Sequence, residues 1–191
     1  MFTKALLAIL LLSSLASSRV ALASPQSDSS AAWAAEGEAP IRRLVAAFVG
    51  RWSVSETHEP SEWSPEGAKG EGIAEFRPGP GGLSLMQEYS STSSMGEFEG
   101  HGITWWDEEV NAFRGIWCEN TSPAGCENVG LAIWEGDQLI TEFAVKTYGE
   151  KTKVRRTIKL IEPDHFTAVF EMAIGDGPMR PAMRIDYRRI P

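Results

Sequence analysis

The chain has 191 residues, with 18 lysines and arginines against 26 aspartates and glutamates, so its formal net charge is −8. This length fits one domain once an N-terminal segment is set aside. A chain this acidic is repelled by a phosphate backbone, which argues against nucleic acid and anionic membrane surfaces as partners.

Residues 1–23 have the pattern of a secretory signal peptide. Lys4 supplies a short basic start, residues 5–12 form an apolar run, and Ala21-Leu22-Ala23 gives a small-x-small cleavage pattern. The apolar run is too short to span a bilayer, and no later stretch is long and apolar enough for a membrane helix. We therefore expect an exported protein, periplasmic or extracellular. Residues 24–38, rich in serine, alanine and acidic residues, are expected to form a flexible leader.

A short helix is predicted next, because apolar residues recur at helical spacing between Pro40 and Gly50. Gly50 ends this helix, and Trp52 lies at the start of the first strand. From there β-type runs alternate with turn residues. Strands are predicted over residues 51–57, 70–77, 83–91, 98–106, 112–118, 127–134, 138–147, 151–160, 165–174 and 182–190.

Short connections between so many consecutive strands predict an antiparallel meander rather than βαβ crossovers. About ten sequentially paired strands are expected to close into a barrel, because closure removes the exposed edges. A barrel of this size is expected to keep an internal cavity. The predicted fold is therefore all-β, a single antiparallel meander barrel over residues 39–191 with one short N-terminal helix. A flattened sandwich is the structural alternative.

The segment from Phe98 to Glu127 is rich in aromatic residues and contains both cysteines. Along its first predicted strand, Gly100 and Gly102 share one face with Trp106, while His101 lies on the other face. A face kept small by two glycines leaves room for a neighbouring backbone or for a ligand.

Cys118 and Cys126 are the only cysteines in the sequence. In an exported protein, two cysteines that close a short loop favour a disulfide over free thiols. A metal site needs more ligands than these two thiols, and the nearest histidine, His101, lies on the preceding strand. A disulfide between the two cysteines is therefore predicted.

Several short motifs resemble those of a known family. Gly50-x-Trp52 after a short helix resembles the opening of lipocalin-like (calycin) barrels. With the motifs that follow, the chain resembles, from about Ile41 to the C-terminus, a family of uncharacterised, mostly bacterial proteins with a lipocalin- or nitrobindin-like β-barrel. The family has no established activity, so the resemblance implies a fold and not a mechanism. The further motifs are Gly70-x-Gly72-x-Ala74, Gly81-Gly82-Leu83-x-Leu85, Phe98-x-Gly100-x-Gly102, Trp106-Asp107 and Phe113-x-Gly115-x-Trp117.

The resemblance to nitrobindins raises the question of haem, which those proteins hold through a histidine on a strand near the C-terminus. The last predicted strand here, residues 182–190, has no histidine. Ser53-Val54-Ser55 also replaces the Gly-x-Gly that follows the opening tryptophan in nitrobindins. Both departures argue against haem, so no cofactor is expected.

The candidate site residues come from strand positions. His101 lies centrally in a predicted strand, where an inward imidazole could bind a metal or move a proton, although a lone strand histidine more often packs or faces solvent. His58 ends the first strand near a long loop, where it could lie at the barrel mouth, and His165, which follows a turn, is expected to be structural or exposed to solvent. With the tryptophans that also pack the core, the residues predicted to line a ligand site are Trp52, His101, Trp106 and Trp117.

Charged residues on the strands give a second indication. Arg155-Arg156 and Arg188-Arg189 are expected to alternate in and out of the barrel, and an inward arginine could neutralise an anionic ligand. The carboxylates of Glu71, Glu75 and residues 107–109 are expected to form a solvated acidic face, because no neighbour would tune their pKa.

Three functions from different classes follow. The first is an exported barrel that binds a small, largely apolar ligand in its interior. The second is an enzyme on the same barrel that uses His101 with a carboxylate. The third is a dimeric protein-interaction module, so the chain is expected to be a monomer or a homodimer. The sequence has no Gly-x-Ser-x-Gly elbow, phosphate loop, dinucleotide fingerprint or His-Glu-x-x-His motif, which favours binding over catalysis.

Overall fold

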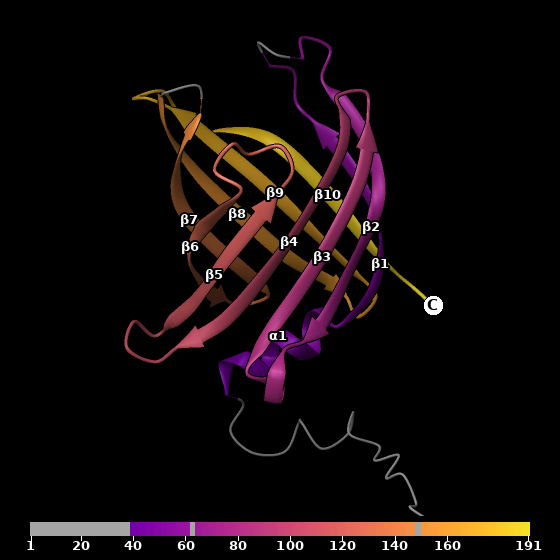
Figure 1. The fold of residues 1–191 in the computed structure, drawn as a ribbon, viewed down its shortest axis with the longest axis vertical. Coiled ribbons are helices and arrows are strands. Elements are labelled where there is room, and N and C mark those ends of the chain that lie inside the picture. Colours follow the sequence, from indigo (N-terminus) through magenta and orange to yellow (C-terminus); the bar gives the residue numbers. More distant parts are fainter. Residues whose placement is uncertain (1–38, 62–63, 148–149) are drawn as a thin grey trace, which may run out of the picture. The chain divides into compact units, whose positions relative to one another are not determined.

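The computed structural model describes residues 39–61, 64–147 and 150–191. Ten antiparallel strands form a closed barrel in this part of the chain (Figure 1). The strands are β1 (Gly50–His58), β2 (Ala68–Pro78), β3 (Ser84–Ser93), β4 (Gly96–Asp107), β5 (Ala112–Glu119), β6 (Cys126–Glu135), β7 (Gln138–Thr147), β8 (Glu150–Glu162), β9 (His165–Ile174) and β10 (Arg180–Ile190).

Each strand pairs with the next along the chain, and β1 closes the barrel by pairing with β10. In this closing pair Arg51 lies opposite Ile190, and His58 lies opposite Met183. The predicted meander barrel is therefore confirmed, and the sandwich alternative is wrong. Closure favours the barrel over the sandwich, because β1 and β10 would otherwise leave two rows of unpaired backbone groups at the sheet edges.

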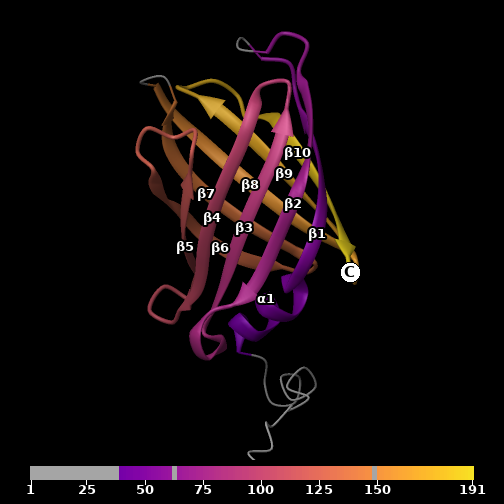
Figure 2. The same cartoon turned by 45° about the vertical axis from the view of Figure 1, so that its right-hand side comes forward.

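Helix α1 (Pro40–Phe48) lies across one end of the barrel, which we call the closed end (Figures 1 and 2). It begins at Pro40, as predicted, and buries Ile41, Leu44 and Phe48 against the strands. Gly50 has a φ of 135°, which suits glycine, and this turn directs the chain into β1. The indole Nε1 of Trp52 donates a hydrogen bond of 2.8 Å to the Phe48 carbonyl oxygen, so the end of the helix is fixed to the first strand.

Aromatic side chains fill the closed end. The ring of Phe166 lies at the centre, with its centroid 4.6 Å from that of Trp52, 5.0 Å from that of Phe48 and 4.2 Å from that of Tyr187. Phe113 is also buried there. Large inward side chains and the apolar face of α1 therefore leave this half of the barrel packed as a core.

The structure adds one short element to the predicted chain organisation. The turn between β2 and β3 contains a short 3₁₀ helix, η1 (Pro80–Gly82). The predicted signal peptide at residues 1–23, the leader at 24–38 and parts of two connections, at 62–63 and 148–149, lie outside the described residues. In the part of the chain that the structure describes, no helix has the length and apolar character needed to cross a membrane.

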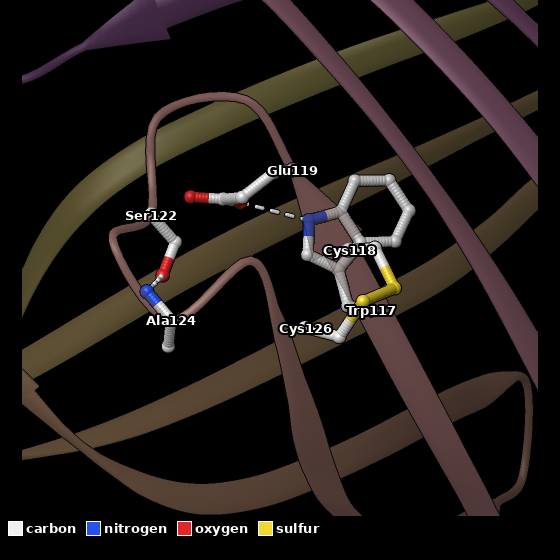
Figure 3. Close-up of a disulfide and its surroundings, with 6 residues drawn as sticks. All are labelled: Trp117, Cys118, Glu119, Ser122, Ala124 and Cys126. Carbon is white, nitrogen blue, oxygen red and sulfur yellow. Dashed lines mark hydrogen bonds between the residues drawn. A yellow bond between two sulfur atoms is a disulfide. The ribbon is translucent and has the colours of Figure 1, made fainter.

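The predicted disulfide is confirmed. Cys118 and Cys126 are bonded and lie opposite each other in the register of β5 and β6, with a Cα–Cα distance of 3.9 Å (Figure 3). The bond spans the base of the loop between the two strands, where Ser122 Oγ accepts a hydrogen bond from the Ala124 amide. It therefore ties down one of the loops at the end of the barrel opposite α1, which we call the open end.

Loss of this disulfide is expected to destabilise the barrel. Replacing both cysteines with alanine should lower the free energy of unfolding by about 2.5 kcal/mol, because the unfolded chain regains the entropy of a short closed loop. Urea denaturation of the oxidised wild type and of the double variant measures this difference. A reducing agent should destabilise the wild type by a similar amount and leave the double variant unchanged. Equal stability of the two proteins would contradict the prediction.

Candidate functional site

The open half of the barrel interior is the strongest candidate for a ligand site. Its inward side chains follow from the register: Trp117 lies opposite Gly102, Phe98 opposite Ser91, and Phe170 opposite Met183. Although these side chains point into the barrel, solvent still reaches part of each one. The half-buried apolar side chains of this region are Phe98, Trp117, Phe143, Phe170, Met172 and Met183.

The three tryptophans predicted to line a site all face the interior, but at different depths. Trp52 is only 1% exposed and belongs to the packed closed end. Trp106 also lies toward that end, where its ring meets the edge of Phe113 at 5.0 Å. Trp117 lies closer to the open end, and its ring stacks on Phe98 at 6.5 Å. Of the three, Trp117 is therefore the one placed in the accessible half.

His101, the fourth predicted residue, lies on the outer face of the barrel and is exposed. The alternation of β4 explains its position, because Gly100 and Gly102 occupy the inward positions on either side of it. Cys118 and Glu88 lie opposite His101 on the neighbouring strands. The enzyme hypothesis uses an imidazole that faces the interior, and the structure does not place His101 there.

His101 borders a shallow outer groove of about 760 Å³, which is lined in part by Glu75, Glu88 and Glu99. All three carboxylates are exposed, and Glu75 among them belongs to the predicted solvated acidic face; Arg77 forms ion pairs of 3.4 Å with Glu75 and 3.7 Å with Glu88. Asp107 departs from that prediction, because a hydrogen bond from Arg114 lowers the pKa of its carboxyl. In the described residues, no three metal-ligating side chains form a group. Because exposed pairs of this kind are weak and screened by salt, the outer groove is a poorer candidate than the interior.

The room beside Gly100 and Gly102 is filled by the chain itself. A Cβ atom built on Gly100 would lie 2.4 Å from the Trp117 ring, and one on Gly102 would lie 2.8 Å from it. The indole therefore lies flat across β4, and its Nε1 donates a hydrogen bond of 2.8 Å to Glu119 (Figure 3). The two glycines make space for this neighbouring aromatic ring and not for an empty pocket beside the strand.

Glu56 is a buried carboxylate that points into the barrel from β1. It is 6% exposed, it accepts a hydrogen bond from the Tyr89 hydroxyl, and its Oε2 lies 3.0 Å from His58 Nε2. Gly70 leaves room for it, since a Cβ there would lie 2.5 Å from Oε2. Burial by itself raises the pKa of Glu56, but hydrogen bonds from His58, Tyr89 and Ser91 outweigh burial and lower this pKa below its ordinary value. Glu56 is therefore an ionised acceptor at neutral pH.

The predicted alternation of Arg155 and Arg156 is present. Arg155 points outward and its Nε donates a hydrogen bond of 2.7 Å to Glu142. Arg156 points inward, where its Nη2 lies 3.3 Å from the hydroxyl of buried Thr141. The Nε of Arg156 is buried and has no hydrogen-bond partner among the described residues. Burial lowers the pKa of this guanidinium.

The other two histidines have carboxylate partners. His58 lies near the open end, is 22% exposed and pairs with Glu56. His165 begins β9, and its Nε2 lies 2.8 Å from Asp186 on β10, in agreement with the predicted structural role. Sequence reasoning missed Glu56, although the alternation of Trp52, Val54 and Glu56 on one face of β1 indicates an inward carboxylate.

The closed meander, the end helix and the partly accessible interior define a lipocalin-like β-barrel. The chain belongs to the family described as "Protein of unknown function (DUF1579)", which matches residues 38–189. This match confirms the predicted resemblance to a family of unknown function. No curated protein matches the chain significantly.

Two solved structures show the same fold. Rv2717c from M. tuberculosis is similar with a TM-score of 0.57 and 13% sequence identity, over 80% of this chain and 99% of that one. The S-type phycobiliprotein lyase CPES from Guillardia theta is similar with a TM-score of 0.54 and 10% identity, over 79% of this chain and 93% of that one. At these identities the similarity establishes the fold alone.

Proposed function

We propose that this protein binds a small, largely apolar ligand in the open half of its barrel. The observation that carries the proposal is the set of inward, apolar and solvent-accessible side chains around Trp117, Phe170 and Met183. Apolar surface that folding leaves accessible inside a barrel is further buried when a ligand enters, and this burial favours binding. The packed closed end forms the floor of such a site.

The proposal includes export of the chain to the periplasm or the extracellular space. The basic start, apolar run and Ala21-Leu22-Ala23 motif of residues 1–23 support it. The disulfide between Cys118 and Cys126 supports it as well, because disulfides persist in oxidising compartments.

Titration with N-phenyl-1-naphthylamine, an uncharged apolar fluorophore, tests interior binding. Fluorescence should rise and saturate with wild-type protein. Met183→Trp places a larger side chain at an inward position and is expected to weaken binding by about tenfold or more. Met179→Trp, in the connection before β10, is the matched control and should bind as the wild type does. No saturable signal from the wild type, or equal binding by both variants, would contradict the proposal.

Native mass spectrometry of protein recovered from an exported fraction tests two further points in one spectrum. A co-purifying small molecule would support the ligand and narrow its class. The spectrum also reports the oligomeric state, for which the outer face of β5 and β6 offers a contact patch. Ile116, Leu131 and Ile133 there are 38%, 42% and 44% exposed, so we propose a homodimer through this patch as the second candidate. A monomer at all concentrations would exclude it.

The proposed ligand is not haem. The Nε2 atoms of His58 and His165 face Glu56 and Asp186 at 3.0 Å and 2.8 Å, and His101 lies outside the barrel. Addition of haem to the purified protein is therefore expected to produce no Soret shift. A shifted Soret band that disappears in His58→Ala would refute this part of the proposal.

A further inference from the structure

We infer that the ligand of this barrel is an amphipathic carboxylic acid, whose carboxylate pairs with Arg156 and whose apolar body extends toward the open end. This inference rests on the proposed function and specifies the chemistry of the ligand. Its starting point is a positive charge inside the barrel that no described side chain neutralises.

Arg156 lies in the middle of β8, where the register places it between Thr141 on β7 and Phe170 on β9. Thr141, which is 1% exposed, supplies an uncharged hydroxyl oxygen. None of the ion pairs formed by described residues includes Arg156, whereas its neighbour Arg155 pairs with Glu142 on the outer face. Solvent reaches part of the Arg156 side chain, so this side chain borders the accessible interior.

The inward carboxylates of the described residues do not compensate this charge. Glu127, which the register places opposite Trp117, forms no ion pair with Arg156, and Glu56 and Glu119 have other partners. Glu56 accepts hydrogen bonds from Tyr89 and His58. Glu119 accepts hydrogen bonds of 2.8 Å from both the Trp117 indole and the Thr121 hydroxyl. A buried charge without a counter-ion carries a large desolvation penalty, and an anion that enters with the ligand would offset this penalty for Arg156.

The chemistry of the site favours a carboxylate as that anion. A guanidinium offers a planar fork of N–H donors that matches two carboxylate oxygens, and the unpartnered Nε of Arg156 is one of these donors. One positive charge without an ion-pair partner is balanced by one negative charge, which a carboxylate supplies. Phe170 flanks Arg156, and Met183 follows it toward the open end, so the path outward is apolar.

Two fluorescent probes that differ only in the head group test the inference. The probes are 11-(dansylamino)undecanoic acid and 11-(dansylamino)undecan-1-ol, titrated separately into the full-length folded protein. The wild type is expected to bind the acid about tenfold or more tightly than the alcohol. The reason is that a hydrogen bond between two charged groups contributes more binding free energy than one to an uncharged hydroxyl. Arg156→Met should reduce this preference to about one, and Arg156→Lys should retain part of it because the charge remains.

Arg155→Met is the matched control, since it removes the adjacent outward charge on the same strand, and it should keep the preference of the wild type. Binding of the acid and the alcohol with equal affinity by the wild type would overturn the inference while leaving the proposed apolar site intact. An acid preference that survives in Arg156→Met would overturn it as well. Absence of binding by both probes would refute the proposed function itself. If Arg156→Met fails to fold, the wild type and Arg156→Lys decide the question.

Discussion

Replacing Trp52 with alanine is expected to lower the free energy of unfolding by about 4 kcal/mol. The indole is 1% exposed, and its ring centroid lies 4.6 Å from that of Phe166. Its hydrogen bond to the Phe48 carbonyl oxygen also fixes α1 across the closed end, and Arg189 lies over its other side at 4.1 Å. The substitution removes packing, a buried hydrogen bond and a cation–π contact at the same place. Urea denaturation followed by far-ultraviolet circular dichroism measures the loss.

Trp105→Ala is the matched control for this prediction. Trp105 lies on the outward face of β4 and is half-buried, so its removal should cost well under half as much. Equal destabilisation by the two substitutions would show that the closed end is not the main core of the barrel. A Trp52→Ala protein as stable as the wild type would contradict the prediction directly.

Replacing Glu56 with glutamine is expected to destabilise the protein by about 2 kcal/mol at pH 7. Glutamine keeps the shape of the side chain but lacks the charge that strengthens the hydrogen bonds from Tyr89 and His58. Its amide group also adds donors to a site that already contains donors. Chemical denaturation of the wild type and the variant at several pH values measures the difference.

The pH dependence of this difference follows from the lowered pKa of Glu56. The contribution of a carboxylate with a lowered pKa in the folded state is full above the unfolded pKa, which is about 4.3 for glutamate. It is lost as the pH falls through the lower pKa of the folded state. The gap between wild type and Glu56→Gln should therefore be widest near neutral pH and narrow below about pH 4.

Glu88→Gln is the control for the Glu56 experiment. Glu88 is 53% exposed on the outer face and lies 3.7 Å from Arg77, so its charge is solvated in the folded and the unfolded protein. Its substitution should change stability by less than about 0.5 kcal/mol at every pH. A constant gap for Glu56→Gln across the pH range would show that the hydrogen bonds do not depend on its ionisation.

Sequence patterns determined most of the fold. Alternating side chains and turn residues located every strand of the barrel, and for β7 and β9 the predicted ends coincide with the observed ones. This success has a local cause, because strand periodicity and turn chemistry depend on neighbouring residues. The pairing of Cys118 with Cys126 was also predictable, since there were only two cysteines to pair.

Only the tertiary structure decided what lies inside the barrel. The alternation of His101 with Gly100 and Gly102 was visible in the sequence, but which of the two faces is inward depends on how ten strands close. Closure placed His101 outside, laid Trp117 across the two glycines, and brought Glu56 together with Tyr89 from a different strand. The same closure left Arg156 inside without a carboxylate partner among the described residues, because burial and charge compensation are properties of residues brought together from distant parts of the chain.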